Sequence, residues 1–203
     1  ESSLGLVGSE MCIRDRMKVV ITGGGGFLGN QLARKLVRRG RLCGISGKAE
    51  TIDELVIFDK IISKQTREGL EEPVRFVEGD IDNRHLIYSL IDRDDISVFH
   101  LASVVSGEGE QNFDLAMQVN LKGGRTVFEA CRARNSLPRM VFASSLAVFG
   151  GSAMPSVVSD TTKPRCESNI LQYNRKICNT TYNDGGHATI QRKSHKEKSC
   201  NSR

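Results

Sequence analysis

Three glycines spaced three residues apart are the first residues of this chain whose pattern indicates chemistry. Gly23, Gly26 and Gly29 follow the apolar run Val19–Ile21. An amphipathic segment then runs to Gly40, which is typical of a helix and its stop. Gly23 would permit a tight turn, Gly26 would let phosphates approach the backbone, and Gly29 would let the helix pack on the strand. The N–H groups and dipole of that helix favour an anion, so the pattern predicts a nucleotide pyrophosphate site; a flexible loop is the alternative.

Two aspartates follow later apolar runs and complete a nucleotide-binding pattern. Asp59 ends the run Leu55–Phe58, where a carboxylate can accept both ribose hydroxyls, and this favours NAD over NADP. It stands 30 residues after Gly29, more than the usual spacing of about 20, so we interpret Leu42–Asp53 as an insertion. Asp80 could meet the adenine amino group. An acidic residue in a turn is the alternative for either aspartate.

Short apolar runs alternate with amphipathic segments from Met17 onward, and this alternation must position the glycines and carboxylates. It predicts an α/β fold with a doubly wound parallel sheet, the Rossmann fold, in strand order 3-2-1-4-5. A ligand would bind above the carboxyl ends of strands one and four. The expected strands are 18–22, 54–58, 74–78, 97–100 and 139–143, and the expected helices are 27–39, 84–91 and one within 112–134.

Composition narrows the class of protein. The 203 residues contain no apolar stretch of membrane-spanning length, so we expect no membrane partner. The net charge of +5 arises in the tail: residues 1–160 carry −1 and residues 161–203 carry +6. A basic tail without interleaved aromatic residues does not favour nucleic-acid binding. The six cysteines form no CxxC pair, so we expect no metal site and a cytoplasmic location.

The two ends of the chain depart from the pattern. Residues 1–16 resemble a translated sequencing-adaptor segment, and we interpret them as a non-native extension before Met17. Residues 17–164 form the expected NAD-binding domain. Residues 165–203 are off-pattern, and we interpret them as a frameshifted or disordered tail.

Several short motifs together resemble one family in order and spacing. They are the glycine triad after Thr22, Asp59, Gly79-Asp80-Ile81, Phe99-His100-Leu101-Ala102, Val119-Asn120 and Ser144-Ser145-x-x-Val148-Phe149-Gly150. The chain is thereby similar to the extended short-chain dehydrogenase/reductases, the NAD-dependent epimerase/dehydratase family. The segments Ala102–Gly107, Asn112–Leu115 and Val148–Gly151 are most similar to its branch of D-erythronate dehydrogenases, which oxidise a sugar acid.

The resemblance implies roles for individual residues. Ser145 takes the place of the family's catalytic Ser/Thr, and its hydroxyl would hydrogen-bond the reacting oxygen of the substrate. Asn120 would stabilise the active-site backbone; a polar residue satisfied at a helix kink is the alternative. The residues expected to contact NAD are Gly23, Gly26, Phe27, Leu28, Gly29, Asp59, Asp80, Ile81, Leu101, Ala102, Ser103 and Asn120.

The catalytic base of the family is where this sequence departs from it. The family removes the hydroxyl proton with a Tyr whose pKa is lowered by a Lys four residues later. Here Tyr173 precedes Lys176 by three residues, and Ile170 stands where the family spacing from Ser145 places the tyrosine. We name Tyr173 and Lys176 as the candidate pair and expect the chain as written to be inactive.

These observations predict part of an NAD-dependent oxidoreductase that acts on a secondary alcohol of a small sugar or sugar acid. A sugar-nucleotide epimerase or dehydratase is the alternative within enzymes. A non-catalytic NAD-binding regulator would keep Gly23, Gly26, Gly29 and Asp59 without the Tyr and Lys. A homodimer is expected for the full-length protein.

Overall fold

The structure, a computed structural model, divides the chain into two compact units, Glu1–Ala143 and Ser144–Arg203. It describes residues 16–136, 138–145, 149, 156–159, 161–162, 182–183 and 187–188. The predicted extension therefore lies outside the described residues except for Arg16, and the predicted tail lies outside them except for four residues.

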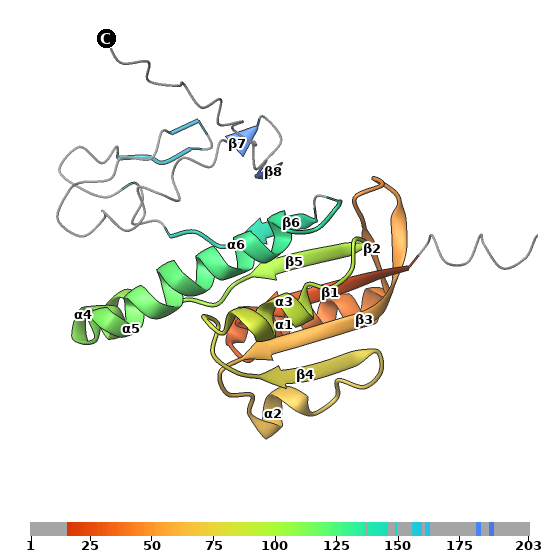
Figure 1. Ribbon diagram of the computed structural model, residues 1–203, viewed down its shortest axis with the longest axis horizontal. Helices are drawn as coiled ribbons and strands as arrows, with labels where there is room; N and C mark the ends of the chain where they lie inside the picture. The colour runs from red at the N-terminus through yellow and green to blue at the C-terminus, as the bar shows by residue number, and fades with distance from the viewer. Residues whose placement is uncertain are drawn as a thin grey trace, which may run out of the picture. The chain divides into compact units, whose positions relative to one another are not determined.

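The first unit is built on a six-stranded sheet (Figure 1). Its strands are β1 (Arg16–Thr22), β2 (Arg41–Cys43), β3 (Ala49–Asp59), β4 (Val74–Glu78), β5 (Ile96–His100) and β6 (Arg139–Phe142). Five of them are parallel in the order β4-β3-β1-β5-β6, which confirms the predicted order 3-2-1-4-5. The carboxyl ends of β1 and β5 lie side by side, because Thr22 is in register with His100.

Helices connect the parallel strands. They are α1 (Phe27–Arg39), α2 (Lys64–Arg67), α3 (Arg84–Leu90), α4 (Ser106–Gln111), α5 (Phe113–Ala116), the π-helix η1 (Met117–Gly123) and α6 (Gly124–Arg132). The predicted helix 27–39 is confirmed at both ends, and Gly40 ends it in the left-handed conformation. The helix expected within 112–134 is the continuous run of α5, η1 and α6. The short helices α2 and α4 were not predicted.

The segment interpreted as an insertion is a β-hairpin, and the predicted start of strand two was wrong. Strand β3 begins at Ala49 rather than Glu54, and its first part pairs antiparallel with β2. Glu50 and Ile52 are buried while Thr51 between them is exposed, the period-two pattern of a half-buried strand. Strand β1 likewise begins two residues before the predicted start at Lys18, because Arg16 and Met17 pair with Thr51 and Ile52.

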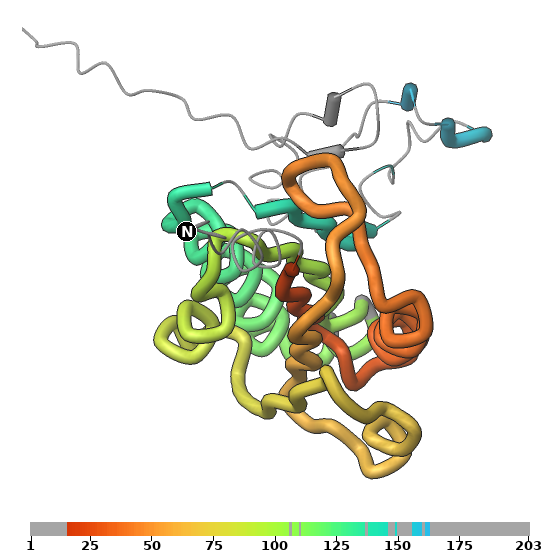
Figure 2. Tube along the Cα trace, turned by 90° about the vertical axis from the view of Figure 1, so that its right-hand side faces the viewer, coloured from red at the N-terminus to blue at the C-terminus, as the bar shows by residue number. Residues whose placement is uncertain are grey.

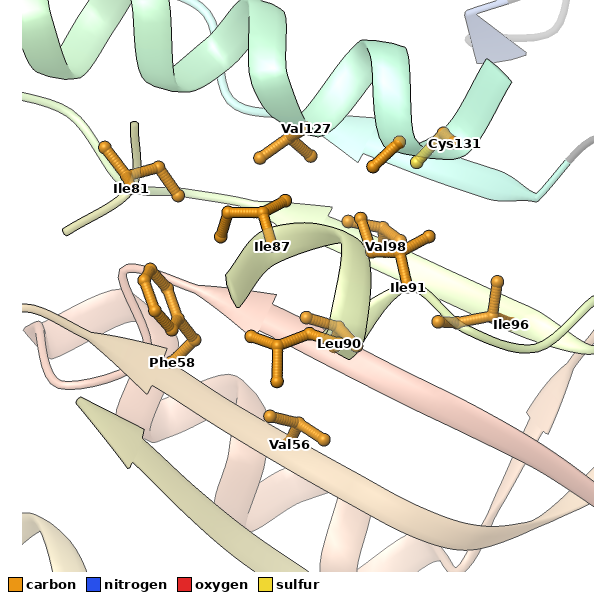
Figure 3. Close-up of a cluster of buried hydrophobic side chains, with 12 residues drawn as sticks. Val56, Phe58, Ile81, Ile87, Leu90, Ile91, Ile96, Val98, Val127 and Cys131 are labelled. Atoms are coloured by element: carbon orange, nitrogen blue, oxygen red, sulfur yellow. The ribbon is translucent and has the colours of Figure 1, made fainter. Parts of the chain in front are cut away.

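Each face of the sheet packs against different helices (Figure 2). On one face, Ala33 and Leu36 of α1 pack against residues such as Ile21 and Ile57. On the other face, α3 and α6 cover the sheet, and Figure 3 shows Ile87 of α3 and Val127 of α6 among the buried side chains. Burial of each Leu, Ile or Val side chain among them stabilises the fold by about 1.5–3 kcal/mol, so this two-sided core holds the strand ends in place.

A buried ion pair marks the amino edge of the sheet. Lys18 of β1 is 1% exposed, and its Nζ lies 2.8 Å from Asp92 and 3.2 Å from Glu54 of β3. Buried charges require such partners, because an unpaired ammonium would be strongly destabilising. This edge is therefore structural, and the opposite edge carries the candidate site.

The second unit has one described pair of strands, β7 (Tyr182–Asn183) and β8 (His187–Ala188), which are antiparallel. Nearer its start, the Thr162 N–H donates to the Ser159 carbonyl and closes a turn. In the part of the chain that the structure describes, the helices are all too short or too polar to cross a bilayer.

Candidate cofactor site

Gly23, in the loop between β1 and α1, and Gly29, in the first turn of α1, have no room for a Cβ. Gly23 has φ +73°, and a Cβ there would lie 2.6 Å from the backbone nitrogen of Ala102. A Cβ at Gly29 would overlap the Gly23 carbonyl oxygen and lie 2.6 Å from the Cα of Gly24. These glycines therefore hold the first turn of α1 tightly against the loop and the end of β5.

Gly26 differs from both, because the space beside it is open. A Cβ there would meet only the Gly23 carbonyl oxygen, at an ordinary 3.4 Å. Gly26 is the N-cap of α1, and as a glycine it has no side chain to accept a hydrogen bond from the first turn of that helix. By contrast, Ser63 and Asn83 cap α2 and α3 with their side chains. The start of α1 thus leaves N–H groups and a positive dipole end for an anion.

Asp59 is fixed beside this loop by two backbone hydrogen bonds. Its Oδ2 accepts from the Gly25 N–H at 2.9 Å, and its Oδ1 accepts from the Lys60 N–H at 2.7 Å. The Gly24 N–H donates to the Phe58 carbonyl, so the end of β3 and the loop form one unit. Each carboxylate oxygen keeps acceptor capacity for a ribose hydroxyl. The sequence located this residue but not its bond to Gly25.

Asp80 forms an ion pair that was not predicted from the sequence. Its Oδ1 lies 2.9 Å from Nζ of Lys60, and both side chains are more than half exposed. The hydrogen bond and charge of Asp80 hold the pKa of Lys60 above its ordinary value. A lysine beside Asp59 and an aspartate at the end of the neighbouring strand were the available signal. Ile81 is buried in the core.

The segment after β5 lies against the glycine loop. The Leu101 N–H donates to the Thr22 carbonyl, and the backbones of Leu101 and Ala102 approach Gly23 most closely. The side chains of Leu101 and Ala102 pack against the two core clusters, while Ser103 is exposed. Phe27 and Leu28, in the first turn of α1, are also exposed, at 79% and 67%. The structure thus places these predicted contact residues at the same edge of the sheet.

Asn120 of η1 holds the segment after β5 with two hydrogen bonds. Its Nδ2 donates to the Val104 carbonyl at 3.0 Å, and its Oδ1 accepts from the Val104 N–H at 2.8 Å. Asn120 therefore supports the backbone after β5 from an irregular helical turn. In the same turn, Gln118 donates to Asp82 at 2.9 Å and ties the segment after β4 to the helix.

A buried histidine lies beneath the site. His100 Nδ1 shares a 2.6 Å hydrogen bond with Thr22 Oγ1, and both residues are 1% exposed. Burial lowers the pKa of His100 to about 4, so the imidazole is neutral at pH 7. The pair joins the carboxyl ends of β1 and β5. Polar residues at the ends of two buried strands were the signal that could have found it.

Of the predicted catalytic residues, the structure describes Ser145. Ser145 is exposed and belongs to the second unit. Tyr173 and Lys176 lie outside the described residues, as does Ile170. Among the residues that the structure describes, no cluster of three or more His, Cys, Asp or Glu could hold a metal ion.

A glycine loop entering an uncapped helix, at the reversal of a parallel sheet, defines a dinucleotide-binding α/β domain. Residues 20–179 match the model of the 3-beta hydroxysteroid dehydrogenase/isomerase family. The chain belongs to this family, which places it among the short-chain dehydrogenase/reductases, as the motifs predicted.

Two relatives and one solved structure give the comparison more detail. D-erythronate dehydrogenase from Cupriavidus necator is 46% identical over 71% of this chain and 44% of that protein. The enzyme of the same name from Haemophilus influenzae is 35% identical over 79% of this chain and 51% of its own length. UDP-glucose 4-epimerase from Thermus thermophilus, solved in complex with NAD, is 26% identical with a TM-score of 0.57 and matches over 73% of this chain and 44% of its own. The chain spans about half the length of these curated relatives.

Proposed function

We propose that this chain carries the NAD-binding part of an enzyme that oxidises a secondary alcohol of a sugar acid such as D-erythronate. The main observation behind this proposal is the open space at Gly26, at the uncapped N-terminus of α1. The Asp59 carboxylate lies next to it, hydrogen-bonded to the glycine loop. Two relatives named D-erythronate dehydrogenase and a structural neighbour solved with NAD support the proposal.

The described residues fit NAD. The pyrophosphate would lie over the first turn of α1, beside Gly26, where backbone N–H groups point at it. The adenosine ribose would donate its hydroxyls to Asp59, and the adenine would lie towards Asp80. The pyrophosphate carries two negative charges. The positive dipole end of α1 favours them, because the first turn of this helix contains no acidic residue. When bound, NAD would accept the hydride from the alcohol carbon of the substrate.

The remaining chemistry requires a hydrogen-bond donor to the substrate oxygen and a base for its proton. We assign the first role to the hydroxyl of Ser145. Tyr173 and Lys176 are the candidate base and its partner, but their three-residue spacing turns Lys176 by about 100° from the position that a four-residue spacing would give on a helix. We therefore propose that this chain binds NAD and does not turn over.

The alternatives differ in where the hydride goes. A sugar-nucleotide epimerase or dehydratase would return it to the substrate, and a regulator would never receive it. The names of the two curated relatives support net oxidation of a sugar acid. We propose a small sugar-acid substrate, a cytoplasmic location and, for the full-length protein, a homodimer.

Calorimetric titration with NAD tests the proposal. The wild-type chain should bind NAD, and Gly26→Ala should weaken binding by at least about tenfold, because a methyl group would occupy the space of the pyrophosphate. Gly107→Ala is the matched control, since a Cβ at this exposed helical position meets nothing within 4 Å. Equal affinity in wild type and Gly26→Ala, or no binding by the wild type, would contradict the proposal.

A further inference from the structure

The ion pair between Lys60 and Asp80 carries an inference about which cofactor the site accepts. Lys60 directly follows Asp59, and its ammonium lies 2.9 Å from Asp80 at the end of the adjacent parallel strand. Its side chain is 66% exposed, so the flexible stem can also point elsewhere. The positively charged Lys60 is therefore the neighbour in sequence of Asp59, the residue assigned to the ribose.

NAD and NADP differ at the 2′ position of the adenosine ribose, and they favour side chains of opposite charge there. NAD presents a 2′-hydroxyl, which the fixed Asp59 carboxylate can accept. NADP presents a 2′-phosphate at the same place, which a carboxylate repels and a nearby ammonium attracts. Lys60 would favour the phosphate if its charge were not neutralised. Asp80 neutralises it, and the three groups together carry a net charge of −1.

We propose that Asp80 makes the site selective for NAD by holding Lys60 away from the 2′-phosphate position, so that two carboxylates, not Asp59 alone, exclude NADP. The inference rests on the proposed function, since it requires the ribose to lie at Asp59. An exposed ion pair is weak in itself, so the effect arises from cancelling the field of the ammonium near a doubly charged phosphate.

The test compares dissociation constants for NAD and NADP, measured by calorimetry on the full chain at one low ionic strength. Their ratio is the measured quantity, because any loss common to both cofactors cancels. Asp80→Asn should shift the ratio towards NADP by about fivefold. Lys60→Gln should reverse that shift in the Asp80→Asn background, and it should change the ratio by less than about twofold in the wild-type background.

Lys48→Gln is the charge-matched control, because Lys48 is exposed on the hairpin at the far end of β3. It should leave the ratio unchanged within about twofold. An equal effect of Lys60→Gln in both backgrounds, no shift in Asp80→Asn, or an effect of Lys48→Gln as large as that of Lys60→Gln would overturn the inference. A wild-type chain that binds NAD while failing these tests would retain the proposed function. A wild-type chain that binds neither cofactor would overturn both.

Discussion

At the scale of single residues, the two outer glycines of the triad and the middle one have different tasks. Gly23 and Gly29 are enclosed by backbone, while Gly26 faces open space. The spacing in the sequence predicted that Gly23 and Gly29 allow close packing, and the clearances in the structure agree with this. Substitution of Gly23 or Gly29 should therefore reduce stability, whereas substitution of Gly26 should reduce NAD binding.

Gly29→Ala should destabilise the first unit. The added methyl would overlap the Gly23 carbonyl oxygen, and backbone cannot give way as a flexible side chain can. We expect a loss of about 1–3 kcal/mol in the free energy of unfolding, measured by urea denaturation. The control Gly107→Ala should be neutral or stabilising by up to about 1 kcal/mol. Equal stability of Gly29→Ala and wild type would show that the helix does not pack this closely.

Stability should depend on pH through His100. Its pKa is about 4 in the folded chain, against about 6.5 when unfolded, so only the unfolded state binds the proton between these values. The stabilisation is complete above pH 6.5 and is lost as the pH falls towards 4, by up to about 3 kcal/mol. Urea denaturation at pH 7.5 and pH 5 measures it. The loss should be smaller in His100→Asn and unchanged in His85→Gln, since His85 is exposed.

At the scale of elements, the π-helix η1 supports the segments that follow two strands. Its i→i+5 hydrogen bonding brings residues five apart onto one face, and Gln118 and Gly123 both meet the segment after β4, at Asp82 and Ile81. Asn120 meets the segment after β5 instead. One irregular turn thus positions both sides of the candidate site.

Asn120→Ala should loosen the segment after β5 without unfolding the sheet. Both Val104 backbone groups would lose their partner, at a cost of about 1–3 kcal/mol. Hydrogen exchange of the amide of Val104 should accelerate at least about tenfold, while that of Val98 in β5 should not change. Asn120→Asp keeps an acceptor for the Val104 N–H and should have an intermediate effect. Unchanged exchange in Asn120→Ala would rule out this role.

The elements that the sequence predicted are those with a local signal. The five parallel strands and α1 have apolar patterns of their own, and Gly40 marks a helix end. The hairpin of β2 and the start of β3 was missed because its polar residues, such as Glu50, become buried only after pairing. The Gly25–Asp59 bond and the Lys60–Asp80 pair join residues far apart in the sequence, and no local pattern encodes them.

At the scale of the whole molecule, the chain should bind NAD without oxidising D-erythronate. Absorbance of reduced cofactor should stay at background with the 203-residue chain, because Tyr173 lacks a lysine four residues later. Translation of the gene in the shifted frame after about Pro164 should place a tyrosine near position 170 and give activity. Turnover by the chain as written that survives Tyr173→Phe but not Ser145→Ala would show that the base lies elsewhere.

The buried Lys18 at the amino edge has a consequence for cooperativity. Its ammonium is compensated only when β1, Glu54 of β3 and Asp92 after α3 have all come together. A partly assembled sheet that lacked either carboxylate would enclose a poorly compensated charge, which is costly in a low-dielectric interior. Intermediates with half of this edge formed are therefore disfavoured. The amino edge thus favours joint assembly of β1, β3 and the segment before β5.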